Sequence, residues 1–343
     1  MRKMLNTLYV TSPDAFLSRD GENLVVKIKE QEALRTPIHY LEGIVTFGYT
    51  GASPALFALC AEKGVSLSFL TEHGKYLASV TGPVRGNVLL RRKQYRLADS
   101  PHECAHLASR FVTGKLINCR VILRRFCSDY ANNSNVQFVE VVGRKLANNV
   151  VKAANATLLE EVRGIEGDGA KLYFSVFDNL ILNDKENFYL KMRSRRPPLD
   201  NMNALLSFLY TLLVNETKSA LETVGLDPYV GFLHRDRPGR PGLALDLMEE
   251  LRPYIADRLA ITMVNRRQLT ANDFVQKETA GVIMKDAARK VLLEAWQNKK
   301  REEITHPFLD EKIPVGLLPY AQALLLARYL RGDLDDYPPF AWK

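Results

Sequence analysis

The stretch that decides the fold is Asn201–Gly225, which reads NMNALLSFLYTLLVNETKSALETVG. Its apolar side chains recur three and four positions apart, which is the spacing of one face of an α-helix. They are Leu205, Leu206, Phe208, Leu209, Leu212 and Leu213. Gly225 is expected to end the helix, because glycine readily adopts the conformation that closes many helices. We therefore predict one long helix with a buried face.

The same helical spacing extends in both directions from this stretch. It runs from Val88 almost to the last residue, and a second stripe consists of Leu245, Met248, Leu251, Ile255 and Leu259. Further helices are predicted over residues 101–128, 136–162, 167–182, 272–298 and 315–331. RRPPLD at Arg195–Asp200 is the best candidate for a rigid internal turn. Residues 86–343 are therefore expected to form a mainly α-helical domain.

The first 85 residues show a different, β-rich pattern. Short runs that are β-branched or that alternate in polarity include Leu24–Ile28 and Gly43–Gly48. One helix is expected among the strands, with Ser53 as its cap and Pro54 in its first turn. The predicted fold class is therefore α+β. A small N-terminal β-sheet or sandwich domain over residues 1–85 precedes the larger helical domain.

Composition restricts the environment and the partner. No segment approaches the roughly 20 apolar residues of a membrane helix, and the first residues lack the apolar run of a signal peptide, so a cytoplasmic protein is expected. The net charge is +8 among 343 residues, which permits an anionic partner without requiring one. The basic residues gather in four clusters, which favours a polyanion. These are Arg91–Arg96, Arg120–Arg125, Lys191–Arg196 and His234–Arg240.

Two segments carry the candidate chemistry. In GIEGDGAKLYF, Gly164–Phe174, Glu166 stands between glycines at the predicted start of a helix, where backbone can approach another group closely. An ordinary glutamate, stabilised by the dipole of a helix start, is the alternative interpretation. The second segment is GFLHRDRPGRPGLALDLMEELRP, Gly231–Pro253, in which His234 precedes a basic loop rich in glycine and proline.

The helix that follows this loop carries Asp246 and Glu249 three residues apart, and so on one face. This acidic face borders the second apolar stripe, and a buried carboxylate is costly unless it is paired or binds a cation. Arg252 could be the pairing partner of Glu249, and His234 could simply be a packing histidine. Spacing alone therefore leaves a metal site and a structural ion pair both open.

Three blocks, in this order, resemble the family of CRISPR-associated integrases, the universal endonucleases of spacer acquisition. They are EGDGAKLYF, RSRRPPLDNMNALLSFLY and GFLHRDRPGRPGLALDLMEELRP. The N-terminal stretches LNTLYVTSPDAFLSRDGENLVVKI and HYLEGIVTFGYTGASPALFALCAEKGVSLSFLT are also similar to that family, particularly to its type I, C-subtype branch. The resemblance covers essentially the whole chain.

This resemblance implies a metal-dependent DNA endonuclease and integrase. Such an enzyme inserts short foreign DNA fragments into a CRISPR array through attack of DNA 3′-hydroxyls on phosphodiesters. The implied ligands of one Mg²⁺ or Mn²⁺ ion are Glu166, His234 and Glu249, with Glu250 as the neighbouring alternative to Glu249. Asp246 falls where relatives place a supporting acid. Gly169 departs from the family pattern, in which a better helix former is expected, so the start of the helix after Glu166 is left open.

The resemblance further implies a homodimer formed through the N-terminal domain. The other implied partners are DNA, as protospacer and CRISPR repeat, and the small CRISPR-associated ruler protein, Cas2. Six arginines are candidates for contacts to DNA phosphates, which position a duplex without reading its sequence. They are Arg193, Arg195, Arg196, Arg235, Arg237 and Arg240. Each could instead form a structural ion pair.

Two other functions fit the same residues. One is a general divalent-metal DNA repair nuclease acting on branched DNA, and the other is a non-catalytic DNA-binding scaffold. The sequence contains no G-x-S-x-G, no Walker-type loop and no dinucleotide fingerprint. It therefore implies neither a serine nucleophile nor a nucleotide cofactor.

Overall fold

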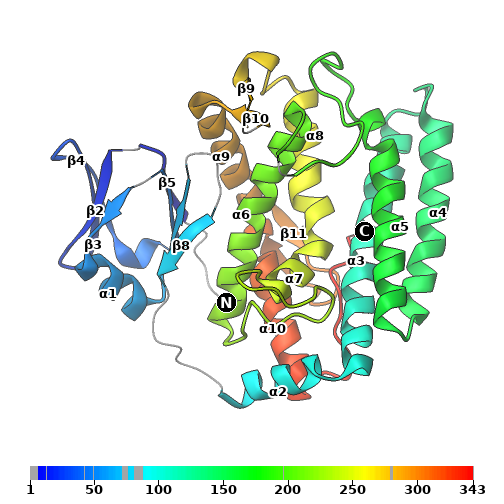
Figure 1. Ribbon diagram of the computed structural model, residues 1–343, viewed down its shortest axis with the longest axis horizontal. Helices are drawn as coiled ribbons and strands as arrows, with labels where there is room; N and C mark the ends of the chain where they lie inside the picture. Colours follow the sequence, from blue (N-terminus) through cyan, green and yellow to red (C-terminus); the bar gives the residue numbers. More distant parts are fainter. Residues whose placement is uncertain are drawn as a thin grey trace. The chain divides into compact units, whose positions relative to one another are not determined.

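The computed structural model describes residues 7–12, 14–41, 43–48, 50–71, 76–80, 88–195, 197–278 and 281–342. The chain divides into two compact units (Figure 1). The first consists of residues 1–86 and 289–301, and the second of residues 87–288 and 302–343. Strands dominate the first unit and helices the second, so the predicted α+β fold class is confirmed. No helix of the described residues is long and apolar enough to cross a membrane.

The described part of the first unit contains two four-stranded sheets. One has the order β1-β5-β7-β8, with bounds Thr7–Val10, Gly43–Phe47, Ser66–Leu70 and Tyr76–Val80. The other has the order β4-β3-β2-β6, with bounds Gln31–Pro37, Asn23–Ile28, Ala15–Asp20 and Gly51–Ala52. β1, β5 and β7 pair in parallel, whereas β2, β3 and β4 form an antiparallel meander. A 3-10 turn, Ile38–Tyr40, follows β4.

Helix α1, Pro54–Lys63, contacts strands of both sheets. Oγ of Ser53 accepts the backbone N–H of Leu56 at 3.3 Å, so the predicted cap forms. The core of this unit is made of aliphatic side chains that alternate along the strands, together with the inner face of α1. Its fully buried members include Leu17, Leu24, Ile44, Leu56 and Leu67.

The second unit is built mainly from helices. They are α2 (Val88–Ala98), α3 (Pro101–Asp129), α4 (Val136–Asn155), α5 (Leu159–Phe177), α6 (Asn201–Thr223), α7 (Gly242–Arg252), α8 (Arg258–Asn265) and α10 (Leu318–Arg331). A π-helical segment, Pro253–Asp257, joins α7 to α8. Helix α9, Asp286–Arg301, begins in this unit and passes into the first at Arg289.

Short strands and turns complete the second unit. Two antiparallel pairs are β9 (Phe274–Lys277) with β10 (Gly281–Met284), and β11 (Glu303–Thr305) with β12 (Lys312–Pro314). The 3-10 turns are Asp178–Leu180, Ala271–Asp273 and Val315–Leu317.

Several predicted helix limits are wrong. The helix predicted over residues 136–162 is broken, because α4 ends at Asn155 and α5 begins at Leu159. Glu166, predicted near a helix start, lies in the middle of α5, since the glycines around it stay helical. The helix predicted over residues 272–298 begins instead as the β9–β10 hairpin, because short apolar runs fit a strand and a helix alike.

Helix α3 is central to the second unit, because it contacts α4, α5 and α7. Figure 1 shows α3, α4 and α5 side by side. The apolar face of α3 is buried and includes Leu107, Phe111, Val112, Leu116, Cys119 and Leu123. Lys115 and Asn118 are buried on the same helix. These two polar side chains lead to the candidate site.

Candidate active site

Helices α3 and α5 approach each other closely at Gly169. A Cβ atom at this position would overlap Cδ2 of Leu116 on α3, far inside van der Waals contact. Glycine at this position therefore has a packing reason, since a larger residue would force the end of the Leu116 side chain or the helix to move. Glu166, one turn earlier on α5, is thereby brought to Lys115, the residue before Leu116.

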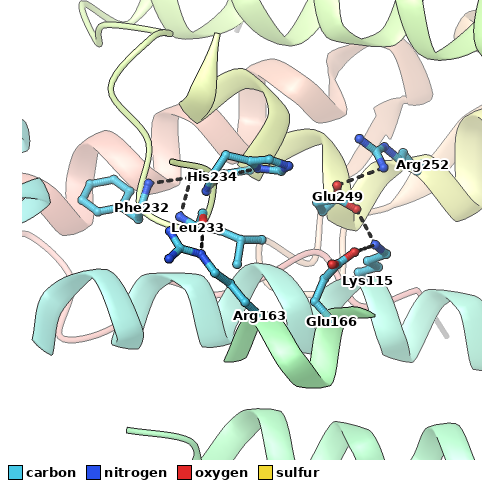
Figure 2. Close-up of polar contacts among 9 residues, drawn as sticks. Lys115, Arg163, Glu166, Phe232, Leu233, His234, Glu249 and Arg252 are labelled. Carbon is cyan, nitrogen blue, oxygen red and sulfur yellow. Dashed lines mark hydrogen bonds and ion pairs between the residues drawn. The ribbon is translucent and has the colours of Figure 1, made fainter. Parts of the chain in front are cut away.

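Lys115 lies between the two glutamates that are predicted as metal ligands (Figure 2). Its Nζ donates to Oε1 of Glu166 and lies 2.7 Å from Oε2 of Glu249. The second oxygen of Glu249, Oε1, lies 2.9 Å from Nη1 of Arg252. Only 8% of the Lys115 side chain and 2% of the Glu249 side chain are exposed. Helices α3, α5 and α7 thus bring two acids and two bases into one mostly buried cluster.

In this cluster the acids and bases stabilise one another's charged forms. Burial raises the pKa of Glu249, but Arg252 first, then Lys115 and His234, bring that pKa below its ordinary value. Burial also opposes the charge on Lys115, yet Glu249 and Glu166 raise its pKa above the usual range. Glu249 is therefore an anion at neutral pH, although its side chain is almost fully enclosed.

Asp246 holds His234 in one orientation. Its Oδ1 lies 2.6 Å from Nδ1 of His234 and accepts the backbone N–H of the same residue at 3.0 Å. Its Oδ2 accepts the backbone N–H groups of Phe232 at 2.6 Å and Leu233 at 3.0 Å. Because Asp246 accepts throughout, Nδ1 of the ring is the donor, and in the neutral ring this leaves the lone pair on Nε2. Metal-binding histidines commonly show this arrangement.

Glu250, the sequence alternative to Glu249, faces a different set of residues. Its Oε1 accepts from the hydroxyl of Tyr337 at 2.5 Å and from Nε2 of Gln322 at 2.9 Å. Its Oε2 accepts the backbone N–H of Phe340 at 2.7 Å. Burial raises the pKa of Glu250 to about 7. Glu250 thus fastens the C-terminal segment to α7, while Glu249 faces Lys115.

The buried segment around Phe340 is tied to α3 as well. Nδ2 of Asn118 donates to the carbonyls of Glu250 at 2.7 Å and of Phe340 at 2.8 Å. The backbone N–H of Trp342 donates to Oδ1 of Asn118 at 2.7 Å. The indole of Trp342 is stacked under the guanidinium of Arg125, 3.8 Å from the ring centroid. The C-terminal segment therefore links the helix of Lys115 to the helix of Glu249.

The predicted ligands are thus partly assembled. Glu166 and Glu249 meet at Lys115, and His234 lies near enough to Glu249 for its charge to lower the pKa of that carboxyl. Among the described residues, no three His, Cys, Asp or Glu side chains gather closely enough to hold a metal ion. The ligand set of Glu166, His234 and Glu249, and the supporting role of Asp246, remain predictions.

The sequence alone did not identify Lys115 as part of the candidate site. It stands four residues after Phe111 and four before Cys119, and so on the buried face of α3. A lysine at such a position needs a buried acid to pair with, and this signal could have been recognised. Its partners, however, lie much further along the chain on α5 and α7, so the sequence does not identify them.

The family is shown by comparison with known proteins. The family whose description is CRISPR associated protein Cas1 matches residues 8–298. This chain belongs to the Cas1 family. It is 52% identical over 343 residues to CRISPR-associated endonuclease Cas1 1 of Chlorobaculum tepidum, with 100% of each chain covered. It is 49% identical over 347 residues to CRISPR-associated endonuclease Cas1 2 of Rhodospirillum rubrum, again with 100% of each covered.

Solved structures of other proteins show the same fold. A CAS1 protein from Thermotoga maritima superposes with a TM-score of 0.81 at 22% identity, covering 98% of this chain and 100% of that one. A casposase bound to its integration product gives a TM-score of 0.84 at 21% identity, covering 99% of this chain and 95% of that one. The fold is therefore kept at low sequence identity.

In this Cas1 chain the arginines ahead of Pro197 do not form one exposed patch. Nη1 of Arg193 donates to Oδ1 of Asn203 at 2.6 Å, and Nη2 donates to Oγ of Ser207 at 3.2 Å. Its guanidinium lies 5.2 Å from the ring centroid of Tyr210. Arg195 is exposed, and Arg196 lies outside the described residues. Arg193 is thus held by its own chain.

The loop after His234 presents its arginines outward. Arg235 and Arg237 are exposed, and Arg240 is half-buried. Nη2 of Arg235 lies 3.1 Å from Glu160 at the start of α5, an exposed pair that is worth little in water. This loop therefore offers cationic groups near the predicted ligand His234. Their contact with DNA remains a prediction.

Proposed function

We propose that this chain is a divalent-metal-dependent integrase of CRISPR adaptation, which joins the 3′-hydroxyl ends of short DNA fragments to a target strand. Membership of the Cas1 family and the relatives named endonuclease Cas1 support the proposal. The observation that carries it is the convergence of Glu166 and Glu249 on one cationic group, together with a histidine that Asp246 orients and whose charge acts on Glu249.

The cluster supplies the kinds of donor atom that a divalent metal ion prefers. Two carboxylates and one imidazole are a suitable ligand set for Mn²⁺ or Mg²⁺, and both carboxylates already face a positive charge. Oε2 of Glu249 is buried and has Lys115 as an ion-pair neighbour, but it accepts no well-directed hydrogen bond from any described residue. Among the described residues, this oxygen is therefore held by its ion pair with Lys115.

The chain's own groups position this chemistry. Glu166, His234 through Nε2, and Glu249 would hold the ion, and Asp246 would keep the histidine in the required tautomer. When bound, the metal neutralises charge that builds up on the phosphodiester and favours in-line attack. The attacking 3′-hydroxyl oxygen gives its proton to solvent and forms a new bond to phosphorus, while the bond to the departing 3′-oxygen breaks and that oxygen takes up a proton. The number of phosphodiester bonds is unchanged, so no energy cofactor is required.

The proposed partners follow from the same family. We propose DNA and the small Cas2 protein as partners, because solved neighbours of the same fold include a Cas6-RT-Cas1–Cas2 complex and a Cas1–DNA complex. We further propose a homodimer formed through residues 1–85, a cytoplasmic location, and the type I, C-subtype branch that the N-terminal stretches resemble. Light scattering at micromolar concentration tests the dimer, and a stable monomer would contradict it.

Strand transfer on a repeat-bearing duplex tests the function. We expect Glu249→Gln and His234→Ala each to reduce Mn²⁺-dependent joining by at least about a hundredfold, because each removes one ligand while leaving most of the surface intact. Binding of DNA without metal should change little. Glu140→Gln and His102→Ala are matched controls, because both residues are exposed on helices of the same unit.

The result separates the competing functions. A general repair nuclease would cut branched DNA with Mn²⁺ but would not join a fragment to the repeat. A non-catalytic scaffold would bind DNA and leave it intact in every variant. Joining at the wild-type rate by Glu249→Gln would disprove the assignment of Glu249 as a ligand.

A further inference from the structure

Lys115 has an unusual position for a lysine. It stands in the middle of α3, and 8% of its side chain is exposed. Lysine is rarely buried to this degree unless an acid pairs with it. Its ammonium group contacts one oxygen of Glu166 and one oxygen of Glu249, which come from two other helices. It therefore occupies the point at which the two proposed ligands meet.

We infer that Lys115 is a built-in competitor of the metal, an internal cation that must leave the two carboxylates before a divalent ion can bind them. The inference rests on the proposed function and adds a residue to it. Lys115 is a positioning residue in this scheme. It holds the carboxylates together in the metal-free protein and sets how tightly the metal binds.

Geometry makes the two cations mutually exclusive. A divalent ion of this type lies about 2.0 to 2.2 Å from each carboxylate oxygen that it binds. Nζ of Lys115 already lies 2.7 Å from Oε2 of Glu249 and also contacts Oε1 of Glu166. An ammonium and a divalent ion cannot both be in contact with the same two oxygens, because their charges repel at such short range.

The neighbouring base behaves differently. Arg252 holds the other oxygen of Glu249, Oε1, at 2.9 Å, and its guanidinium lies 4.9 Å from the ring centroid of Tyr210. The two oxygens of Glu249 are therefore divided between a guanidinium packed on an aromatic ring and an ammonium on a flexible stem. Exchange of Lys115 for a metal leaves the Arg252 pair in place, so the orientation of Glu249 is kept.

Metal binding to the wild-type protein and to Lys115→Met tests the inference. Titration calorimetry with MnCl₂ alone, after removal of metal by a chelator, should show at least about tenfold tighter binding to Lys115→Met, because no internal cation has to be displaced. Without metal the same variant should melt at a lower temperature, since Glu166 and Glu249 both lose the ammonium group and Glu249 keeps only its pair with Arg252. Saturating Mn²⁺ should restore most of that loss. Lys145→Met is the matched control, because Lys145 is exposed on α4.

The outcomes are distinguishable. Absence of Mn²⁺ binding to both proteins would overturn the proposed metal site, and this inference with it. Equal or weaker binding to Lys115→Met than to the wild type would overturn this inference and leave the proposed function standing.

If Lys115→Met does not fold, the wild-type protein decides the question. The acylation rate of Lys115 by an amine-specific reagent is then measured by mass spectrometry, with Lys145 as the internal reference. We expect faster acylation of Lys115 with Mn²⁺ than with chelator, because displacement frees the ammonium. An unchanged or slower rate would overturn the inference.

Discussion

At the scale of single residues, adjacent glutamates on α7 have separate tasks. Glu249 faces Lys115 and Arg252, whereas Glu250 accepts hydrogen bonds from Tyr337 and Phe340. Successive helical residues point about 100 degrees apart, so two neighbours on a fully buried helix meet different surroundings. The distinction between the proposed ligand Glu249 and the structural acid Glu250 thus depends on what packs on each side of α7.

A buried acid near this cluster predicts how stability depends on pH. Burial raises the pKa of Asp257 to about 6, although Tyr210 donates to its Oδ1 at 2.6 Å. The folded protein therefore binds this proton more tightly than the unfolded chain, and the stabilisation is complete below about pH 4. It is lost as pH rises through about 6, and its size is roughly 3 kcal/mol.

Asp257→Asn should remove this dependence, because the amide does not titrate. Urea unfolding between about pH 4 and about pH 7.5, a range that brackets the raised pKa, measures the effect as the difference in free energy of unfolding between the wild type and the variant. The exposed residue Asp129 supplies the control variant Asp129→Asn, for which no comparable difference is expected. Parallel curves for the wild type and Asp257→Asn would contradict the prediction.

Part of the candidate site could be proposed from the sequence, because three segments resemble the Cas1 family, and part of it could not. Glu166, His234 and Glu249 stand in recognisable segments, because each is set among the glycines, basic residues or apolar stripe that shape its neighbourhood. Lys115 does not lie in such a recognisable segment. Its role depends on α5 and α7, which follow much later in the sequence. The orientation of the Arg193 side chain could not be predicted either. Its hydrogen-bond acceptors, Asn203 and Ser207, take up their positions only when α6 is formed.

At the scale of elements, the close packing of α5 on α3 depends on the absence of a side chain at Gly169. The predicted start of α5 is wrong because glycines such as those around Glu166 often mark a helix boundary. A Cβ atom at Gly164 or Gly167 would have no neighbour within 4 Å, whereas one at Gly169 would meet Leu116. A glycine needed for close packing and one that is merely tolerated look alike in a single sequence.

Gly169→Ala should therefore push α3 and α5 apart. We expect a loss of about 1–3 kcal/mol in the free energy of unfolding, the usual cost of overpacking, together with weaker Mn²⁺ binding as Glu166 moves from Glu249. Gly164→Ala is the matched control, and it should be neutral or stabilising by up to about 1 kcal/mol. Gly169→Ala combined with Leu116→Ala should recover metal affinity if steric overlap is the cause. Equal effects of the two single glycine variants would disprove the packing argument.

At the scale of the whole molecule, the proposed binding of DNA should depend on the exposed loop arginines. We expect Arg235→Ala with Arg237→Ala to weaken DNA binding and to lower the slope of log affinity against log salt by roughly 0.9 for each phosphate that is no longer neutralised. Mn²⁺ affinity should stay unchanged, since these charges serve the substrate. Fluorescence anisotropy at a series of salt concentrations measures the slope.

Arg193→Ala provides the contrast, because its guanidinium is bound by Asn203 and Ser207. It should lower the melting temperature and leave the salt slope nearly unchanged. A normal salt slope in the double loop variant would show that DNA binds elsewhere.

The first unit combines residues 1–86 with residues 289–301, so it can be completed only late during synthesis of the chain. β1 is an edge strand of its sheet, and the carbonyl of Thr7 on that strand accepts from Nε2 of Gln297 at 2.9 Å. The two residues are 290 positions apart, so at about 5 to 20 residues per second the ribosome adds Gln297 roughly 15 to 60 s after Thr7. Throughout that interval β1 lacks the contact with α9, and an uncovered strand edge can pair with another chain. Slower translation should therefore lengthen the period in which newly synthesised chains can associate through the uncovered edge of β1.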